Sequence, residues 1–195
     1  TSWFDVGFLE LKQITWTAPA ALLEKLFGYE AVHEITGWDD LKNRLASDRR
    51  CFAYFHPRMP DEPLIFVWVA LVKGMASNIS ELLENRMPDK DSAGIDTAIF
   101  YSISNAQAGL SGINFGNFLI KRVVDKLSIE LESIKTFATL SPMPGFMPWL
   151  QNNLENHHLE FLSVDQKEML ARTASKRSSK SSLMFLLNET QWMDE

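Results

Sequence analysis

The spacing of apolar and polar positions predicts a chain that alternates between strands and helices over its first 140 residues. Strands are expected where apolar residues alternate with polar ones, or run continuously over a few positions. These stretches are residues 8–16, 49–56, 64–72, 97–104 and 134–140. Helices are expected where apolar residues recur every three or four positions. These stretches are residues 17–27, 36–45, 77–87, 117–131 and 146–154, with two more at 163–174 and 183–193.

Turn-forming residues mark several ends of these elements. Pro19 suits the first turn of a helix that Gly28 is expected to stop. Thr36 and Asp39 have the spacing of a capping box, with aspartate in the place of glutamate. The proline-rich stretch 57–63 is expected to form a hairpin loop outside the sheet.

The order of elements indicates an α/β (α+β layered) domain. A strand, helix and strand follow one another closely between residues 97 and 140, which predicts one right-handed parallel crossover in a mixed sheet. Beyond residue 145 only helices are expected, with a polar connection at 173–182. We therefore expect a core over residues 1–150 and a helical extension of the same domain over 151–195.

Composition excludes several classes of protein. The 195 residues are 46% hydrophobic, enough for one filled core. The formal net charge of −6, without a long basic stretch, argues against a nucleic-acid binder. No run approaches the roughly 20 apolar residues of a membrane span. The single cysteine, Cys51, excludes an internal disulfide, is expected to be a buried strand residue, and fits a reducing, cytoplasmic location.

A glycine-punctuated turn follows the strand at 97–104 and precedes the helix at 117–131. Gly109, Gly112 and Gly116 let backbone N–H groups approach an anion at a helix N-terminus, which favours a phosphate site. The glycines could equally serve to pack the helix tightly on the sheet. Their spacing does not fit the dinucleotide fingerprint, and the Lys-Ser/Thr of a P-loop is absent. Lys121 and Arg122 oppose the helix dipole unless an anion shares the site; otherwise they are ordinary solvated cations.

Ser141 is a second candidate because it ends the strand at 134–140 and is followed by two prolines that fix the backbone. A serine in that place is also a common turn former. No Gly-x-Ser-x-Gly elbow surrounds it, so a hydrolase is not supported. His33 and His56 fall near element ends, and His157 and His158 are consecutive, so a metal cluster is not expected.

Several blocks in the same order resemble the malonyl-CoA decarboxylase family. They include Phe100–Ser104, Gln107–Ile113, Gly116–Val124 and the Leu-Ser-Pro-Met-Pro-Gly-Phe motif at 140–146. Upstream, residues 14–16, Glu30–His33 and 49–51 are similar too, as are 62–64 and 69–71. The Gln-x-Gly-x-x-Gly pattern at 107–112 also resembles the pyrophosphate loop of GNAT-type acyltransferases, which hold coenzyme A.

The resemblance implies a GNAT-like catalytic domain that converts malonyl-CoA to acetyl-CoA and CO₂ in fatty-acid metabolism. It implies no cofactor, because coenzyme A is part of the substrate, and a homo-oligomer for the full-length protein. Ser141 takes the place of the active-site serine. The coenzyme would be bound by Ser111, Gly112, Ile113, Asn114, Phe115, Gly116 and Asn117, with Ser102, Gln107, Gly109, Lys121 and Arg122 as secondary candidates.

Two departures from the family pattern bear on activity. Asn114 stands where the family often has an acidic residue. The family's histidine segment, resembling Asn-Phe-His-Leu-x-Asn-Gly, does not occur in these residues, so a portion after Glu195 is expected to be missing. A GNAT-type acyltransferase and an inactive coenzyme-binding fragment are the alternatives.

Overall fold

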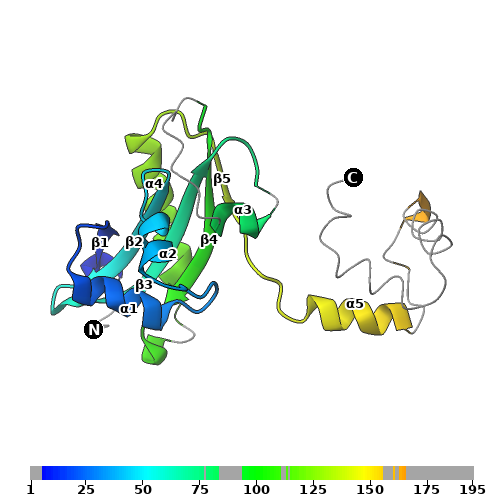
Figure 1. The fold of residues 1–195 in the computed structure, drawn as a ribbon, viewed down its shortest axis with the longest axis horizontal. Coiled ribbons are helices and arrows are strands. Elements are labelled where there is room, and N and C mark those ends of the chain that lie inside the picture. Colours follow the sequence, from blue (N-terminus) through cyan, green and yellow to red (C-terminus); the bar gives the residue numbers. More distant parts are fainter. Residues whose placement is uncertain are drawn as a thin grey trace. The chain divides into compact units, whose positions relative to one another are not determined.

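The structure is a computed structural model that describes residues 6–76, 78–83, 94–110, 113, 115–155, 160 and 163–165. The chain divides into two compact units, Thr1–Pro142 and Met143–Glu195. The first unit contains a five-stranded sheet in the order β1-β2-β3-β4-β5 (Figure 1). Its strands are β1 (Glu10–Ile14), β2 (Arg49–His56), β3 (Met59–Val72), β4 (Thr97–Asn105) and β5 (Thr136–Thr139).

The first four strands pair antiparallel, and β4 pairs with β5 in parallel. The helix α4 (Phe115–Glu130) connects β4 to β5, so the expected crossover and mixed sheet are confirmed. The central strand β3 is buried from Pro63 to Leu71 because both faces of the sheet are covered.

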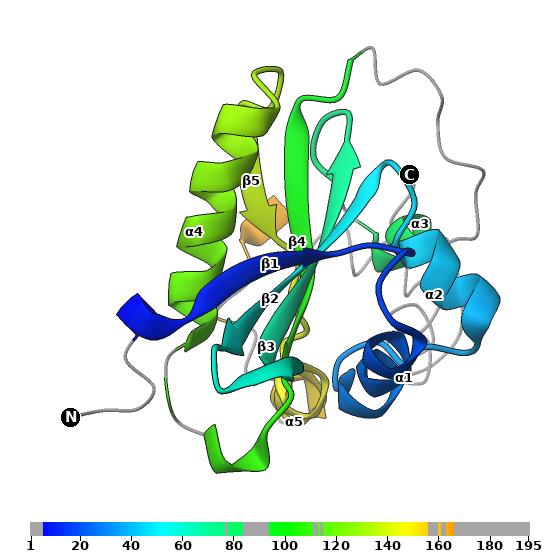
Figure 2. The same cartoon turned by 90° about the vertical axis from the view of Figure 1, so that its left-hand side faces the viewer.

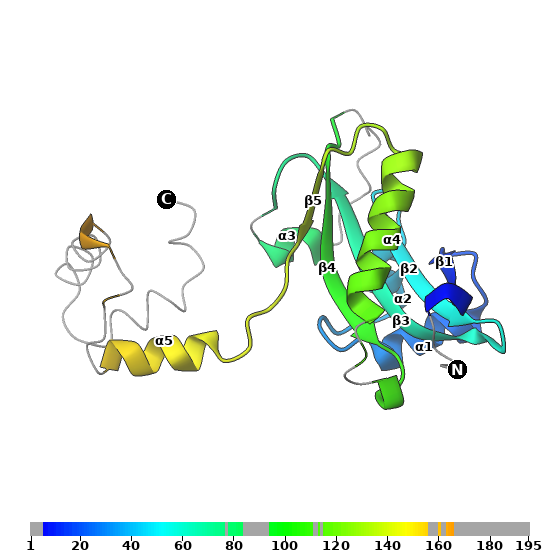
Figure 3. The ribbon, with the colours of Figure 1, turned by 180° about the vertical axis from the view of Figure 1, so that it is seen from behind.

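The sheet lies between two helical layers (Figure 2). One face carries α1 (Ala20–Tyr29) and α2 (Trp38–Arg44), and the short α3 (Ile79–Leu83) also packs into that core. The other face is covered by α4, which lies in front of the strands in Figure 3. Its buried residues Phe115, Leu119, Val123 and Leu127 recur every four positions; the apolar spacing in the sequence predicts Val123 and Leu127 on this face but not Phe115 and Leu119.

Several expected boundaries are wrong, the first at the start of α1, where Pro19 is the N-cap and lies before the first turn. The helix α1 passes through Gly28 and ends at Tyr29, because the chain turns away only at Glu30, which is bound to the sheet. The N-cap of α2 is Gly37, and Thr36 donates from its N–H and hydroxyl to Asp40 rather than pairing with Asp39.

Another wrong boundary is that of the loop at 57–63. β3 already begins at Met59, so Pro60 and Pro63 lie inside the strand. The register with β2 shifts twice beside them, between Tyr54 and Phe55 and between Phe55 and His56. Prolines are tolerated in such an interrupted ladder because fewer N–H donors are needed there.

The second unit begins with α5 (Phe146–Glu155), which confirms the helix expected at 146–154. Gly145 precedes it with φ of 83°, a conformation that favours glycine. The rings of Phe146 and Trp149 stack with centroids 5.8 Å apart. The helices expected at 163–174 and 183–193 and the connection at 173–182 lie outside the described residues, apart from residues 163–165. Within the described part of the chain, no helix is both long and apolar enough to span a membrane.

Candidate functional site

Because β4 and β5 are parallel, the segments that follow them, which contain the candidate site residues, begin at the same end of the sheet. Parallel strands have their carboxyl ends at the same edge. The glycine turn and the N-terminus of α4 follow the end of β4, and Ser141 follows the end of β5. The fold therefore places Ser141 and the first turn of α4 toward the same end of the sheet.

The two strands part before β4 ends. β5 pairs with β4 from Thr97 to Phe100, and the last backbone hydrogen bond runs from Leu140 N–H to the Phe100 carbonyl at 2.9 Å. β4 continues to Asn105 without a partner strand on this side among the described residues. Ser141 directly follows Leu140, the last residue of this segment that is hydrogen-bonded to β4, and β4 runs on for about 16 Å from Phe100 to Asn105 at ~3.3 Å per residue.

A β-bulge in β4 occurs where the strands part. Phe100 pairs with Val69 and Ser102 pairs with Trp68, so Tyr101 is an extra residue in the ladder with β3. Bulges re-aim side chains and are common beside active sites. Here Tyr101 packs in the core under α1 and α2, and Ser102 also reaches that side, because it contacts Glu30.

The predicted coenzyme loop is only partly described. Ser111, Gly112 and Asn114 lie outside the described residues. Ile113 is exposed, Phe115 is buried as the first residue of α4, and Asn117 is exposed in its first turn. The first turn contains no acidic residue; the Phe115 N–H donates to the Ile113 carbonyl at 2.8 Å, and the next N–H groups have no acceptor within the helix. These features leave the start of α4 open to an anion.

Gly116 lies against the sheet. A Cβ added there would meet Ile103 Cγ2 at 3.5 Å and Ile65 Cδ1 at 3.8 Å, which are ordinary contacts. Its missing side chain therefore faces the protein. The packing interpretation fits this glycine better than the idea that it makes room for a ligand.

The basic pair lies farther from the helix start than expected. The helix α4 begins at Phe115, so Lys121 and Arg122 are in its second turn, about 9–10 Å along the axis at 1.5 Å per residue. Both side chains are exposed. Because the dipole acts mainly within the first turn, it gives less reason to assign them to an anion. Arg122 instead lies near the hydroxyl of Tyr54, whose pKa burial raises and Arg122 partly lowers.

The other three secondary candidates, Gln107, Gly109 and Ser102, lie in two different environments. Gln107 is half-buried and Gly109 is exposed, beside and within a 3₁₀ turn at Ala108–Leu110. Ser102 is buried and donates to Glu30 Oε1 at 2.6 Å. Its hydroxyl therefore holds the Glu30 carboxylate.

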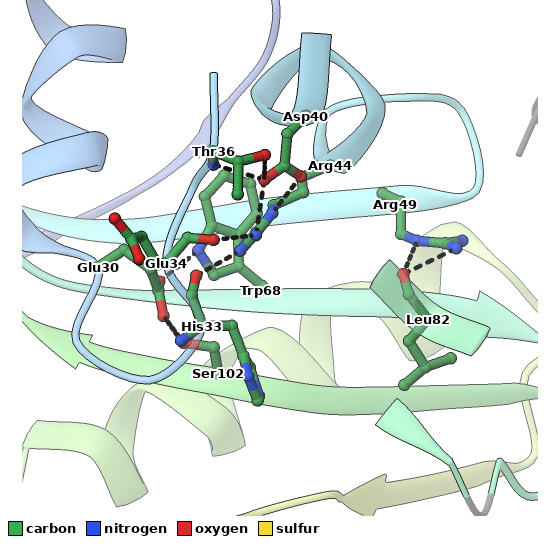
Figure 4. Close-up of polar contacts among 10 residues, drawn as sticks. All are labelled: Glu30, His33, Glu34, Thr36, Asp40, Arg44, Arg49, Trp68, Leu82 and Ser102. Atoms are coloured by element: carbon green, nitrogen blue, oxygen red, sulfur yellow. Dashed lines mark hydrogen bonds and ion pairs between the residues drawn. The ribbon is translucent and has the colours of Figure 1, made fainter. Parts of the chain in front are cut away.

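Glu30 is the centre of a polar network that sequence reasoning missed (Figure 4). Its carboxylate accepts from Trp68 Nε1 at 2.8 Å and from the hydroxyls of Ser102 and Ser104. It also accepts from the backbone N–H groups of Val32 at 3.0 Å and His33 at 2.9 Å. One carboxylate thus fixes the chain after α1 to both β3 and β4. The only sequence signal was its membership in the Glu30–His33 block.

Arg44 fixes the same loop from the other side (Figure 4). Its guanidinium, 3% exposed, pairs with both Asp40 oxygens at 2.8 and 2.9 Å. It also donates to the carbonyls of His33 and Glu34, each at 2.8 Å. Burial would raise the pKa of the Asp40 carboxyl, but hydrogen bonds from Arg44 and from Thr36 outweigh it and lower that pKa.

A cleft of about 670 Å³ lies at a different place. Its lining includes Trp38, Leu83 and three acidic residues, Glu34, Asp39 and Asp40. None of the predicted site residues lines it, and its carboxylates disfavour an anionic coenzyme. Among the described residues, no three His, Cys, Asp or Glu side chains are placed so that they could hold one metal ion. Cys51 is buried, as expected, and burial raises the pKa of its thiol.

The fold is an α/β domain. The N-terminus of α4 and Ser141 follow the carboxyl ends of its two parallel strands. The family model described as malonyl-CoA decarboxylase C-terminal domain matches residues 7–195. The solved malonyl-CoA decarboxylase from Agrobacterium vitis is 50% identical, with a TM-score of 0.75 over 87% of this chain and 42% of that one. The one from Rhodopseudomonas palustris is 46% identical, with a TM-score of 0.73 over 96% of this chain and 44% of that one.

Curated relatives agree. The mitochondrial malonyl-CoA decarboxylase of the goose Anser anser anser is 39% identical over 99% of this chain and 40% of its own length. That of Mus musculus is 41% identical over 86% of this chain and 33% of its own length. The chain belongs to the malonyl-CoA decarboxylase C-terminal domain family, and it spans less than half the length of these relatives.

Proposed function

We propose that this chain supplies the coenzyme-binding and acyl-binding site of an enzyme that converts malonyl-CoA to acetyl-CoA and CO₂. The observation that carries the proposal is the parting of β4 and β5. It leaves one edge of β4 free from Tyr101 to Asn105 among the described residues, with Ser141 beside its start and α4 beyond its end. Coenzyme A is a long molecule with phosphates near one end and the thioester at the other. Two sites separated along a strand suit that shape.

The phosphates would lie at the N-terminus of α4, where backbone N–H groups and the helix dipole favour negative charge. The amide-bearing arm would lie along the free edge of β4, whose unpaired backbone groups can donate to and accept from it. The acyl group would then reach Ser141. Family membership and the similar malonyl-CoA decarboxylase structures support this substrate.

Decarboxylation breaks the bond between the carboxyl carbon and the α-carbon. The electron pair passes into the thioester as an enolate, CO₂ leaves, and a proton then adds to the α-carbon. The thioester carbonyl itself accepts the electrons, so the chemistry requires an oxyanion stabiliser and a proton donor. The Ser141 hydroxyl, exposed at the strand end, would donate to the malonyl group as charge develops on it. The resemblance assigns the proton donor to a histidine segment that these 195 residues do not contain.

The test is Ser141→Ala in the protein as its gene encodes it, measured by release of labelled CO₂ from malonyl-CoA. We expect a loss of about 100-fold, the effect of removing one oxyanion donor, with affinity for coenzyme A unchanged. Ser128→Ala, an exposed serine near the end of α4, is the control and should change neither. Near-normal turnover of Ser141→Ala contradicts the proposal. Acylation of an added amine without CO₂ release would favour an acyltransferase instead.

We also propose a place in fatty-acid or malonate metabolism, a cytoplasmic location and a homo-oligomeric full-length protein. The free, buried Cys51 supports a reducing compartment. Exposed aromatic side chains, among them Trp38 and Phe118, support association. Fractionation of the source cells tests the location, and light scattering of the encoded protein tests the oligomeric state.

A further inference from the structure

Two buried polar atoms beside the bulge in β4 have no hydrogen-bond partner in the described part of the chain. They are Nε2 of His33 and the hydroxyl oxygen of Tyr101. The two rings are neighbours, with centroids 6.3 Å apart and planes inclined by 38°. Leaving one buried polar atom without a hydrogen bond destabilises the folded protein. Two such atoms on neighbouring side chains, both able to donate a proton, therefore require a reason.

The backbone of His33 is held from both sides. Its N–H donates to Glu30 at 2.9 Å, and its carbonyl accepts from Arg44 at 2.8 Å (Figure 4). Glu30 is in turn bound to β3 and β4 through Trp68 and Ser102. Two charged side chains thus fix the position of this histidine, and its buried ring nitrogen Nε2 is left without a hydrogen bond.

The side chain of Tyr101 is also held in one position. It is 1% exposed, and the bulge directs it into the core under α1 and α2. Burial raises the pKa of its hydroxyl, so the group stays a proton donor at neutral pH. The nearby charges of Arg44 and Arg49 lower that pKa, whereas Cys51 and Glu30 add to the rise.

We propose that His33 Nε2 and the Tyr101 hydroxyl together bind the free carboxylate at the end of the acyl group. Tyrosine donates through its O–H, and histidine donates through Nε2–H, so the pair presents two donors to one anionic group. Tyr101 is the first residue of β4 after the parting from β5, and Ser141 is the first residue after Leu140, whose N–H makes the last hydrogen bond to β4. The inference rests on the proposed function and deepens it: the pair would distinguish a carboxylated acyl group from a plain one.

Two unreactive ligands test the proposal in the protein as its gene encodes it. S-(2-carboxyethyl)-CoA carries the carboxylate but has no carbonyl to accept electrons, so it is not decarboxylated. S-propyl-CoA has the same chain length without the charge. We expect the native protein to bind the first at least tenfold more tightly, and Tyr101→Phe and His33→Ala each to reduce that preference by about tenfold. His33→Gln, which keeps an N–H donor, should restore part of it.

Tyr54→Phe is the matched control, because it removes another buried tyrosine hydroxyl, on the α4 face of the sheet, where Arg122 lies near it. It should leave the preference unchanged. Tyr101→Phe should also keep or raise the melting temperature, since it removes an unsatisfied group. An unchanged preference in both Tyr101→Phe and His33→Ala, with both ligands still bound, overturns this inference alone. Failure of the native protein to bind either ligand or coenzyme A overturns the proposed function with it.

Discussion

Ser102 on β4 donates a 2.6 Å hydrogen bond to Glu30, which lies 72 residues earlier in the chain. This contact joins the segment after α1 to the strand that borders the candidate site. Since Glu30 also accepts from Trp68, Val32 and His33, a single carboxylate holds a large part of that layer in place.

Replacing Glu30 by glutamine should destabilise the protein. An amide has one oxygen acceptor where the carboxylate has two, and its NH₂ would face donors such as Trp68 Nε1. Each donor left unsatisfied costs about 1–3 kcal/mol, so we expect the free energy of unfolding to fall by about 2 kcal/mol or more. Urea denaturation measures it. Glu24→Gln, on the exposed side of α1, is the control, and an equal effect of both changes would contradict the role of the network.

The Asp40–Arg44 pair should make stability depend on acid pH. The pKa of Asp40 in the folded protein is below its ordinary value of 3.8, so the unfolded chain binds its proton more readily. The stabilisation is therefore fully present above about pH 4, and is lost as the pH falls through the folded pKa. In Asp40→Asn, stability near neutral pH should be lower and should decline less steeply below pH 4. Urea denaturation at several pH values checks this, and an unchanged slope would contradict it.

A negative charge at the start of α4 should affect folding and coenzyme binding in opposite directions. Asn117→Glu places a carboxylate in the first turn, which the helix dipole favours by about 0.3–1 kcal/mol, but the same charge repels phosphates. We expect the melting temperature to hold or rise and the affinity for coenzyme A to fall about tenfold, measured by calorimetry. Ser128→Glu makes the same change of charge near the other end of the helix. It should leave affinity unchanged; equal weakening by both would mean that the anion site is elsewhere.

Gly116→Ala should be tolerated. The new methyl group would make ordinary contacts with Ile103 and Ile65, and alanine favours the helix over glycine by up to about 1 kcal/mol. Because the methyl faces the sheet, coenzyme affinity should stay unchanged. A clear loss of affinity without a loss of stability would show that the ligand needs the bare backbone at this glycine.

Local patterns in the sequence predicted the strands, the crossover and α4, because each depends on residues near in sequence. The apolar run at 97–104 and the four-residue spacing in α4 are such patterns. The errors at Gly28 and at 57–63 have long-range causes. Glu30, the residue after α1, accepts a hydrogen bond from the distant Ser102. Shifts in the pairing with β2 accommodate Pro60 and Pro63.

Only those parts of the candidate site that lie within one short segment of the sequence could be predicted. The glycine turn and Ser141 each stand out as a short motif, and parallel pairing of their strands brings them to one edge. The environment of Tyr101 depends on a bulge, and that of His33 on two partners, Glu30 and Arg44. No periodicity in the sequence marks such contacts.

The central claim is that coenzyme A lies along the free edge of β4, between the start of α4 and Ser141. Amide hydrogen exchange of the encoded protein, with and without coenzyme A, tests it most directly. We predict slower exchange on binding at residues 101–105 of β4 and 115–118 of α4. Slower exchange at residues 36–44, beside the acidic cleft, with no change along β4, would contradict it.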